Sequence, residues 1–357
     1  MPDPSNEYIR VDHNVLRDFV TEVISRLGVQ REDAFVTADV LVQAELRGIE
    51  SHGVQRLARY VNGIKQGAID TRAHIKVINE TPSTALVDGG NGLGQPVGKF
   101  GMDLCLRKAE QAGAAFVCVR NSNHYGIAGY YAMMALPRQM IGMSFTNSRP
   151  LAVPTHGRQA LIGTNPISIA VPAGNELPFV LDMATSVVPI GKVEVAAIKG
   201  VPIPLGWAVD GSGLPTTDPA AVLSGGGALP LGGTAEFSGY KGYGLAVMVD
   251  ILCGVLSGAG FAALVGGKNG PANVGHFFAA MRVDAFRPLG EFKAAMDSLL
   301  RSLKDSPKAE GEGRIFVAGE KEFEREQEYR LDGIPLYHKV LQDVQRIGKD
   351  LDVEWKA

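Results

Sequence analysis

The stretch Asn121-Ser122-Asn123-His124-Tyr125-Gly126 lies between two segments of different character. Apolar, β-rich sequence leads into it over Ala114–Val119, and helix-like sequence with little charge follows over Ile127–Leu136. This pattern predicts a strand, a short loop and a helix. His124 would then have its position fixed by the strand, while the loop leaves an imidazole nitrogen free. Because the ordinary pKa of imidazole is about 6.5, His124 is a candidate acid/base group; a histidine that caps the helix or bonds to backbone is the plainer alternative.

The composition is that of an ordinary globular protein with enough chain for about two domains. Its 357 residues are 45% hydrophobic and 20% charged, and the formal net charge is −3. Lysine and arginine form no basic stripe, so we expect no nucleic-acid partner. The first ten residues are polar and lack the apolar segment of a secretory signal, so we expect a cytoplasmic protein with no membrane partner.

The three cysteines, Cys105, Cys118 and Cys253, lie far apart in apolar surroundings. An odd number without paired spacing argues against a disulfide framework, and no Cys/His spacing suggests a metal site. We therefore expect a reducing compartment and no metal ligands.

Hydrophobic spacing divides the chain into a helical beginning, an α/β middle and a helical end. Residues 11–75 are apolar at helical spacing, and beyond them β-rich runs alternate with helical ones, which indicates an α/β fold on a central sheet. The apolar run from Gly244 to Val265 contains Asp250 and is broken by glycines, so it predicts a buried helix and its following loop. The expected strands are 75–78, 84–88, 114–119, 141–145, 168–171, 179–182, 276–284 and 314–317, and the expected later helices are 97–112, 127–136, 190–198, 243–256, 292–303, 321–331 and 336–350.

The C-terminal helices are expected to return and pack on the N-terminal ones. Residues 1–75 and 286–357 would then form a discontinuous helical domain, and residues 76–285 would form the α/β domain.

The segment from Arg47 to Tyr60 predicts an anion site. Ser51 has the chemistry of an N-cap for a helix over 52–65. A histidine and a guanidinium near a helix N-terminus can hold a carboxylate, whereas a solvated basic face is the alternative. The residues that would share one face of this helix are His52, Arg56, Arg59 and Tyr60.

The glycines Gly92, Gly94 and Gly98 lie between an expected strand and an expected helix, where a dinucleotide fingerprint would lie. Their spacing is one residue too long and includes Pro96, and no acidic residue ends a second strand about 20 residues later. We interpret them as a tight turn without a cofactor role.

Five short stretches combine small polar residues with potential ligand groups: Ser51-His52-Gly53 through Tyr60, Asn121–Gly126, Gly163–Pro166, Asp182–Ser186 and Gly239–Gly244. Their order and spacing resemble the type 2 malate/L-lactate dehydrogenase family, also called sulfolactate dehydrogenase-like or ureidoglycolate dehydrogenase-like. The resemblance covers residues 8–345 and is nearest to the archaeal-type malate dehydrogenases of that family.

The resemblance implies an NAD- or NADP-dependent dehydrogenase acting on the CH–OH group of a 2-hydroxy acid. It implies a non-Rossmann cofactor domain with a mixed sheet beside the helical domain, and a homodimer or higher homo-oligomer with active sites near the subunit interface. His124 matches the acid/base group, and Ser51, His52 and Arg56 match the catalytic residues on the substrate side. A late turn that usually reads Pro-Gly-Glu is Ala318-Gly319-Glu320 here. The positions that match cofactor-binding residues are Ser148, Asp182, Met183, Ala184, Lys241, Gly319 and Glu320.

The chemistry of these residues agrees with the implied roles. His124 would take the hydroxyl proton of the substrate, while Arg56 would clamp its C1 carboxylate at two points. Asp182 would accept hydrogen bonds from the cofactor, unless it caps a helix. Lys241 would reach a phosphate or ribose of the cofactor, unless it is an exposed turn lysine.

Malate requires a partner for its second carboxylate. We predict Arg149 for this role, with Arg59 or His156 as alternatives; a surface or cofactor-phosphate role for Arg149 is equally open. We therefore predict a malate dehydrogenase. The alternatives are a lactate, sulfolactate or other 2-hydroxy acid dehydrogenase, an imine or 2-oxo acid reductase and, least favoured, a non-catalytic scaffold. The predicted substrate contacts are Arg56, Tyr60, Arg149, Thr164 and Asn165.

Overall fold

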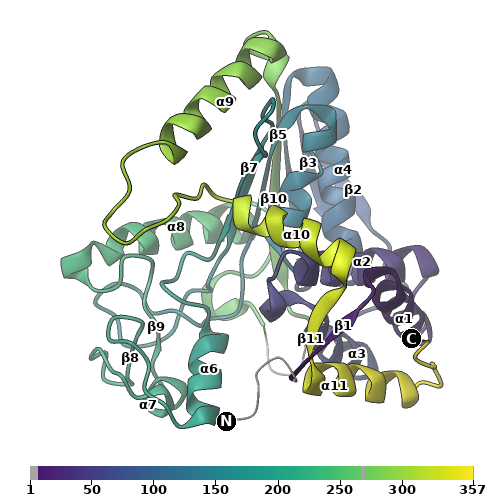
Figure 1. The fold of residues 1–357 in the computed structure, drawn as a ribbon. Coiled ribbons are helices and arrows are strands. Elements are labelled where there is room, and N and C mark those ends of the chain that lie inside the picture. The colour runs from purple at the N-terminus through teal and green to yellow at the C-terminus, as the bar shows by residue number, and fades with distance from the viewer. Residues whose placement is uncertain (1–6, 267–269, 357) are drawn as a thin grey trace.

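The computed structural model describes residues 7–266 and 270–356. At its centre is a seven-stranded sheet in the order β2-β3-β4-β10-β5-β6-β7 (Figure 1). Within the described chain, β3 and β4 form the one parallel pair of this sheet, and its other pairs are antiparallel. The predicted mixed α/β class is confirmed, and the sheet differs from the parallel sheet of a doubly wound nucleotide fold. The strands are β2 (Lys76–Glu80), β3 (Thr84–Asp88), β4 (Ala114–Ser122), β5 (Met140–Thr146), β6 (Ile167–Val171), β7 (Phe179–Met183) and β10 (Val274–Arg282).

Strand β10 comes late in the sequence but occupies the middle of the sheet. It pairs with β4 on one side and β5 on the other, and its first seven residues are buried. An apolar run of this kind fits a strand that is covered on both faces. β10 therefore lies directly beside the strand that leads to His124.

Helices α4 (Gly94–Ala112) and α5 (Ala128–Met133) cover one face of the sheet. The first turn of α4 presses on the loop that carries His124, because a Cβ at Gly94 would lie 2.3 Å from the carbonyl oxygen of Asn123 and 2.4 Å from that of His124. Such an approach requires glycine. The run of glycines at residues 92–98 thus has a packing role at the candidate site.

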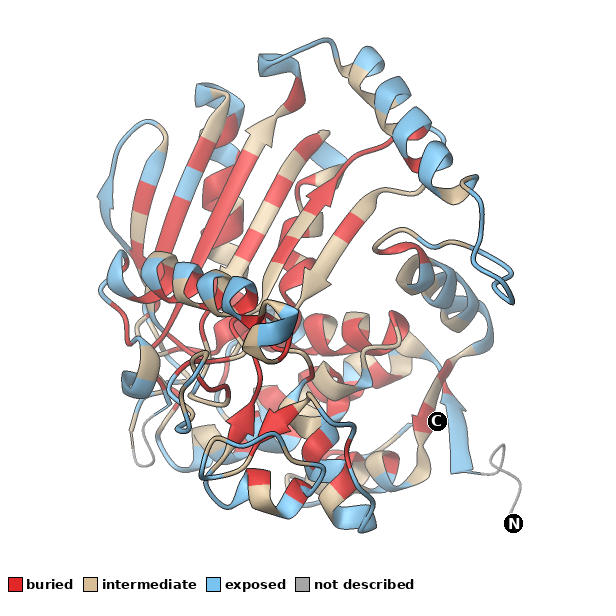
Figure 2. Cartoon of the chain, turned by 90° about the vertical axis from the view of Figure 1, so that its left-hand side faces the viewer, coloured by how far each residue is buried: buried red, intermediate tan, exposed pale blue. Residues whose placement is uncertain are grey.

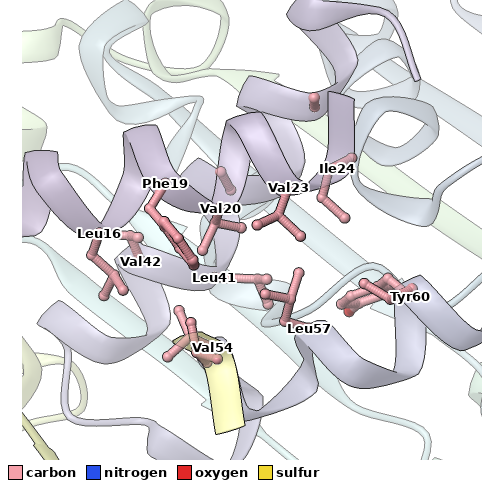
Figure 3. Close-up of a cluster of buried hydrophobic side chains, with 14 of the residues drawn as sticks. Leu16, Phe19, Val20, Val23, Ile24, Leu41, Val42, Val54, Leu57 and Tyr60 are labelled. Atoms are coloured by element: carbon pink, nitrogen blue, oxygen red, sulfur yellow. The ribbon is translucent and has the colours of Figure 1, made fainter. Parts of the chain in front are cut away.

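The N-terminal helices form a separate hydrophobic core (Figure 3). Helices α1 (His13–Ser25) and α2 (Arg31–Leu46) bury apolar side chains at helical spacing against α3 (Leu57–Lys65). The C-terminal helix α11 (His338–Lys349) adds Leu341 and Val344 to this core. The predicted return of the C-terminus is confirmed for this helix.

A two-stranded ribbon that the sequence did not predict ties the ends of the chain together. Strand β1 (Tyr8–Val11) pairs antiparallel with β11 (Ile334–Tyr337), and Val11, Ile334 and Leu336 belong to the helical core. Each strand is only four residues long. The division of the chain at residues 75 and 286 stays a prediction.

Helix α9 (Leu289–Lys304) lies at the far end of the sheet (Figure 1). Asp297 holds it there, since its carboxylate accepts hydrogen bonds from the backbone N–H groups of Gly174, Asn175 and Glu176 in the turn between β6 and β7. Helix α10 (Glu320–Asp332) then crosses back toward the helical core.

Residues 184–265 form a lobe of small elements (lower left in Figure 1). Val193, Ala208 and Val222 share its core. Its elements are α6 (Ile190–Lys199), β8 (Ala208–Val209), α7 (Pro219–Leu223), β9 (Gly227–Ala228), α8 (Gly239–Asp250) and a π-helical turn at Ile251–Val255.

Three predicted elements need correction. No strand forms at 314–317 in the described chain, where only the neighbouring Ala318 carbonyl accepts a hydrogen bond from Val180 of β7. The helix predicted over 52–65 begins at Leu57 and is preceded by short 3-10 turns at Glu50–His52 and Val54–Arg56, because Gly53 between them is extended.

The helix predicted as buried over 243–256 exposes an apolar stripe that includes Met248, Ile251, Val255 and Leu256. The sequence did not reveal this, because both the buried side and the exposed side of the helix are apolar. None of the helices in residues 7–266 and 270–356 combines the length and hydropathy needed to cross a bilayer.

Candidate active site

His124 follows β4 and remains partly exposed. Its Nδ1 lies 2.7 Å from the hydroxyl of Tyr60, which extends from α3. Burial lowers the pKa of His124 well below its usual 6.5, and the nearby Arg59, His52 and Arg56 lower it further. The imidazole is therefore neutral at pH 7 before an anion enters.

His52 and Ser51 lie beside His124, as the sequence predicted. The rings of His52 and His124 stack with centroids 5.6 Å apart at 21°. The hydroxyl of Ser51 lies 2.9 Å from Nδ1 of His52, so Ser51 orients this ring instead of capping a helix. Burial, with Arg56 and Arg59, lowers the pKa of His52 to about 4.

The loop that carries His52 is clamped to α2 by Glu45, a residue that sequence reasoning missed. The Glu45 carboxylate is 3% exposed and accepts a hydrogen bond from the backbone N–H of Val54 at 2.7 Å. A Cβ at Gly53 would lie 1.9 Å from the same carboxylate oxygen. Burial raises the pKa of Glu45 to about 8. Its place in a helical pattern gave no sequence signal that its carboxyl faces inward.

Tyr60 lies in the helical core and contacts His124. The residue is 1% exposed, its ring lies in the helical core of Figure 3, and its hydroxyl is bonded to His124. Tyr60 thus contacts the candidate acid/base group, and its contact with substrate stays a prediction.

Arg56 and Arg59 lie close to this histidine pair, and Arg149 lies close to Arg59. Arg56 donates from Nε to the backbone carbonyl of Ser51 at 2.6 Å, which aims its guanidinium. The pKa of Arg59 is lowered first by desolvation and then by the repulsion of Arg56 and Arg149, although the residue as a whole is exposed. Among the described residues, none of the three forms an ion pair with a carboxylate within 4.0 Å. The pocket thus carries positive charge without a protein counterion and can hold a dianion.

The alternative cation His156 does not belong to this cluster. It lies near the exposed carboxylate of Glu236 and contributes to lowering the pKa of that group, after Thr234 and the Glu236 backbone.

A second group of predicted residues surrounds Ser148 at the end of β5. The Ser148 hydroxyl accepts a hydrogen bond from the backbone N–H of Thr164 at 3.0 Å. Asn165 accepts from the Ser148 N–H at 3.0 Å and donates to the carbonyl of Ala246 in α8 at 2.8 Å. Thr185 donates its hydroxyl to the carbonyl of Thr164 at 3.1 Å. These bonds bring the ends of β5, β6 and β7 together with α8.

Asn165 is fully buried and both ends of its amide are engaged within the protein, and its contact with substrate stays a prediction. Lys241 lies in the first turn of α8 and is exposed, while Met183 and Ala184 are partly exposed just before Thr185. Serine and threonine hydroxyls, exposed backbone and one free ammonium are a donor set that suits the hydroxyl and phosphate groups of a nucleotide.

Asp182 has taken the role of a helix cap. Its Oδ2 accepts a hydrogen bond from the backbone N–H of Gly129 at 2.6 Å, in the first turn of α5. Burial raises the pKa of Asp182 to about 6, although the Gly129 bond and Arg47 oppose the shift. Since α5 follows His124 directly, Asp182 braces the loop of the candidate acid/base group.

Glu320 lies in an ion-pair cluster at the start of α10. It is 4% exposed and lies 3.3 Å from Nζ of Lys304 and 2.8 Å from the guanidinium of Arg314. Gly319 has φ +92° and packs against Val180 of β7. The turn therefore lies next to the residue that is two positions before Asp182 on this strand. The carboxylate of Glu320 is thus committed to holding α10 and the following chain in place.

In the described part of the chain, no three His, Cys, Asp or Glu side chains are arranged to hold a metal ion. The candidate site comprises two groups of residues, the histidines and arginines around His124 and the hydroxyl groups around Ser148.

Comparison with known proteins identifies the family of the chain. Residues 11–345 match the family described as malate/L-lactate dehydrogenase. The chain is 51% identical to a malate dehydrogenase of Pyrococcus horikoshii over 97% of each chain, and 41% identical to an L-sulfolactate dehydrogenase of Methanocaldococcus jannaschii over 94% of this chain and 95% of the relative. The solved malate dehydrogenase of Entamoeba histolytica superposes with a TM-score of 0.93 at 35% identity, covering 97% of this chain and 99% of the other.

Proposed function

The chain belongs to the malate/L-lactate dehydrogenase family, and from this premise we propose that it catalyses the reversible, NAD(P)-dependent oxidation of malate to oxaloacetate. It is an oxidoreductase that acts on the CH–OH group of a 2-hydroxy acid. The observation that carries the choice of malate is the pair Arg56 and Arg59 beside His124, with Arg149 near Arg59, since none of these arginines forms an ion pair among the described residues.

His124 is the proposed proton carrier. With its own proton on Nδ1, donated to the Tyr60 hydroxyl, the neutral ring keeps a lone pair on Nε2 for the substrate hydroxyl. In the direction of reduction the imidazolium returns that proton to the oxygen on C2. A bound nicotinamide supplies the hydride acceptor or donor in this chemistry. A dicarboxylate in the pocket favours the imidazolium because it offsets the repulsion of the arginines.

Arg56 is proposed to bind the C1 carboxylate, with its Nε held by the Ser51 carbonyl and its other nitrogens facing outward from that anchor. Arg149 and Arg59 are proposed to bind the second carboxylate. Arg149 follows Ser148 directly, so a cofactor-phosphate role for Arg149 is the competing proposal.

NAD and NADP are both compatible with the proposed cofactor residues. Ser148, Met183, Ala184 and Lys241 offer hydroxyl, backbone and ammonium groups on one side of His124. Gly319 and Glu320 would act more distantly, through the position of β7 and α10.

A homodimer is the proposed assembly, and exposed apolar surface supports it. Phe116 on β4 is 45% exposed, and Figure 2 shows further exposed positions along the strands of the sheet. Ile251 and Val255 of the π-helical turn extend this surface and are 51% and 58% exposed. Apolar patches of this kind mark protein contacts in soluble proteins.

Sulfolactate is the second candidate substrate, because a sulfonate could occupy the same arginine pocket and a sulfolactate dehydrogenase is among the relatives. The test is a set of initial rates with NADH or NADPH against oxaloacetate, sulfopyruvate, pyruvate, 2-oxoglutarate and piperideine-2-carboxylate, with His124→Ala as control. Fast oxaloacetate reduction that is lost in the control supports the proposal. Another acceptor that is faster by about tenfold would replace malate. Failure to bind NADH or NADPH in a fluorescence titration would indicate a scaffold.

A further inference from the structure

His276 lies in β10 at the centre of the sheet and is completely buried. Its Nδ1 is 2.7 Å from the hydroxyl of Thr146, and its Nε2 is 2.7 Å from the hydroxyl of Ser122. Ser122 stands two residues before His124, and Thr146 stands two residues before Ser148. One side chain therefore joins the loop of the proton carrier to the loop that begins the proposed cofactor pocket.

A bulge in β4 creates this connection. His276 is opposite Val119 and Val274 is opposite Ser122, so three residue steps on β4 match two steps on β10. The extra residue reverses the alternation of side chains, and Asn121 within it has φ +51°. Ser122 consequently points to the same face as His276, where a regular strand would have turned it away.

The carbonyl contacts of the two hydroxyls favour a proton on Nδ1. The Thr146 hydroxyl lies 3.1 Å from the carbonyl of Gly275 and 3.2 Å from that of Asn147, whereas the Ser122 hydroxyl has only the more distant carbonyl of Asn123 at 3.4 Å, so we assign Nδ1–H of His276 as the donor to Thr146. Nε2 is then an acceptor, and Ser122 donates to it. Burial lowers the pKa of His276 to about 3, which keeps the ring in this neutral form.

Tyr125 extends the contact to the residue that follows His124. Its ring stacks on His276 with centroids 4.4 Å apart at 3°, and its hydroxyl is 2.9 Å from that of Ser144 in β5. The imidazole is thus held from both ring nitrogens and from one face.

We propose that His276 is a positioning residue that sets the spacing between the acid/base group His124 and the cofactor pocket at Ser148, through separate bonds to Ser122 and Thr146. The inference rests on the proposed function. Its physical basis is that hydride and proton transfer each require their groups to be placed within a fraction of an ångström. Neither loop needs to contact the other, because the imidazole spans β10 between them.

Two conservative variants separate the two bonds. In His276→Asn the amide nitrogen reaches the Nδ1 position and keeps the donor to Thr146, while the bond to Ser122 is lost. In His276→Gln the amide oxygen reaches the Nε2 position and keeps the acceptor for Ser122, while the bond to Thr146 is lost. Phe278→Leu, another fully buried change on the same strand, serves as the control for general loss of packing.

The first readout is hydrogen exchange of the free protein. We expect His276→Asn to speed exchange in the segment around 122–124 alone, and His276→Gln to speed it around 146–148 alone. The second readout is functional: His276→Asn should lower kcat by about tenfold with an unchanged Kd for NADH or NADPH, whereas His276→Gln should raise that Kd by about tenfold. The Kd is measured by fluorescence titration.

Equal effects of the two variants on both segments would overturn the proposal, and so would the same pattern in Phe278→Leu at a matched loss of Tm. These outcomes differ from a failure of the proposed function. In that case the unaltered protein would neither bind the cofactor nor reduce any acceptor, and yet each variant would still speed hydrogen exchange in its own segment alone.

Discussion

The hydroxyl of Tyr60 lies 2.7 Å from Nδ1 of His124, although the two residues are 64 positions apart in the chain. The bond joins α3 of the helical core to the loop that follows β4 in the sheet. His124, the proposed proton carrier, is therefore held by a helix that does not belong to the sheet that leads to it.

Tyr60→Phe removes this bond and leaves the ring in the core. We expect kcat to fall by about tenfold with little change in the KM for malate, because the tautomer of His124 is no longer fixed while the arginines still bind the carboxylates. Steady-state kinetics measure the effects on kcat and on KM separately. A rise in KM at constant kcat would instead indicate that Tyr60 contacts the substrate.

The pH dependence of the rate should follow the lowered pKa of His124. Oxidation of malate needs the neutral ring, so its kcat/KM should rise with pH through a pKa below 6.5 and stay level above it. Reduction of oxaloacetate needs the imidazolium, so its kcat/KM should fall as pH rises over the same range. If kcat/KM for malate oxidation rose with a midpoint above pH 6.5, the result would contradict the lowered pKa of His124.

Arg149→Ala tests the second carboxylate. Loss of a charge-assisted bond of about 1.5–3 kcal/mol should raise the KM for oxaloacetate by about 10- to 100-fold and leave that for pyruvate nearly unchanged. The measurement is a pair of initial-rate curves with each acceptor. An enzyme that keeps its KM for oxaloacetate but loses affinity for NADPH would assign Arg149 to the cofactor phosphate.

Glu45→Gln tests the clamp on the substrate loop. The pKa of Glu45 is raised to about 8 from 4.5, so the folded state favours its neutral form. Its contribution to stability is complete below pH 4.5 and is lost as pH rises through about 8. The stability of Glu45→Gln relative to the unaltered protein should therefore grow between pH 5 and pH 9, on the order of 1–3 kcal/mol. Urea unfolding at both pH values measures it.

Ile251→Glu tests the apolar surface proposed to form the dimer. Ile251 is 51% exposed, so the charge is tolerated in a monomer but not at a dry interface. We expect light scattering after gel filtration to show a dimer for the unaltered protein and a monomer for this variant. Leu331→Glu, at an 86% exposed position of α10, is the matched control. A dimer that survives Ile251→Glu would place the interface elsewhere.

The local sequence predicted most helices and strands, because the spacing of apolar residues along a segment is a local property. Strand β3 has the predicted bounds, and α4, α6 and α9 differ from prediction by a few residues at their ends. The predicted neighbours Ser51, His52 and Arg56 do lie beside His124, since one loop carries all three.

Other features depend on contacts between distant segments. The ribbon of β1 and β11 is too short to show in either segment alone. The local sequence of Asp182 fits either cofactor binding or helix capping, and only the tertiary structure brings the N–H of Gly129 to 2.6 Å from its carboxylate.

By itself, the sequence determined the succession of helices and strands, the presence of a histidine, arginine and hydroxyl set, and a resemblance that names its family. Only the tertiary structure decided which of these groups meet. Tyr60 contacts His124, Asn165 contacts Ser148, Glu45 holds the loop that carries His52, and His276 lies between Ser122 and Thr146. The physical reason is that β10, which comes late in the sequence, lies between β4 and β5 in the sheet. It therefore brings together residues that are far apart in the chain, and such contacts cannot be predicted from local sequence.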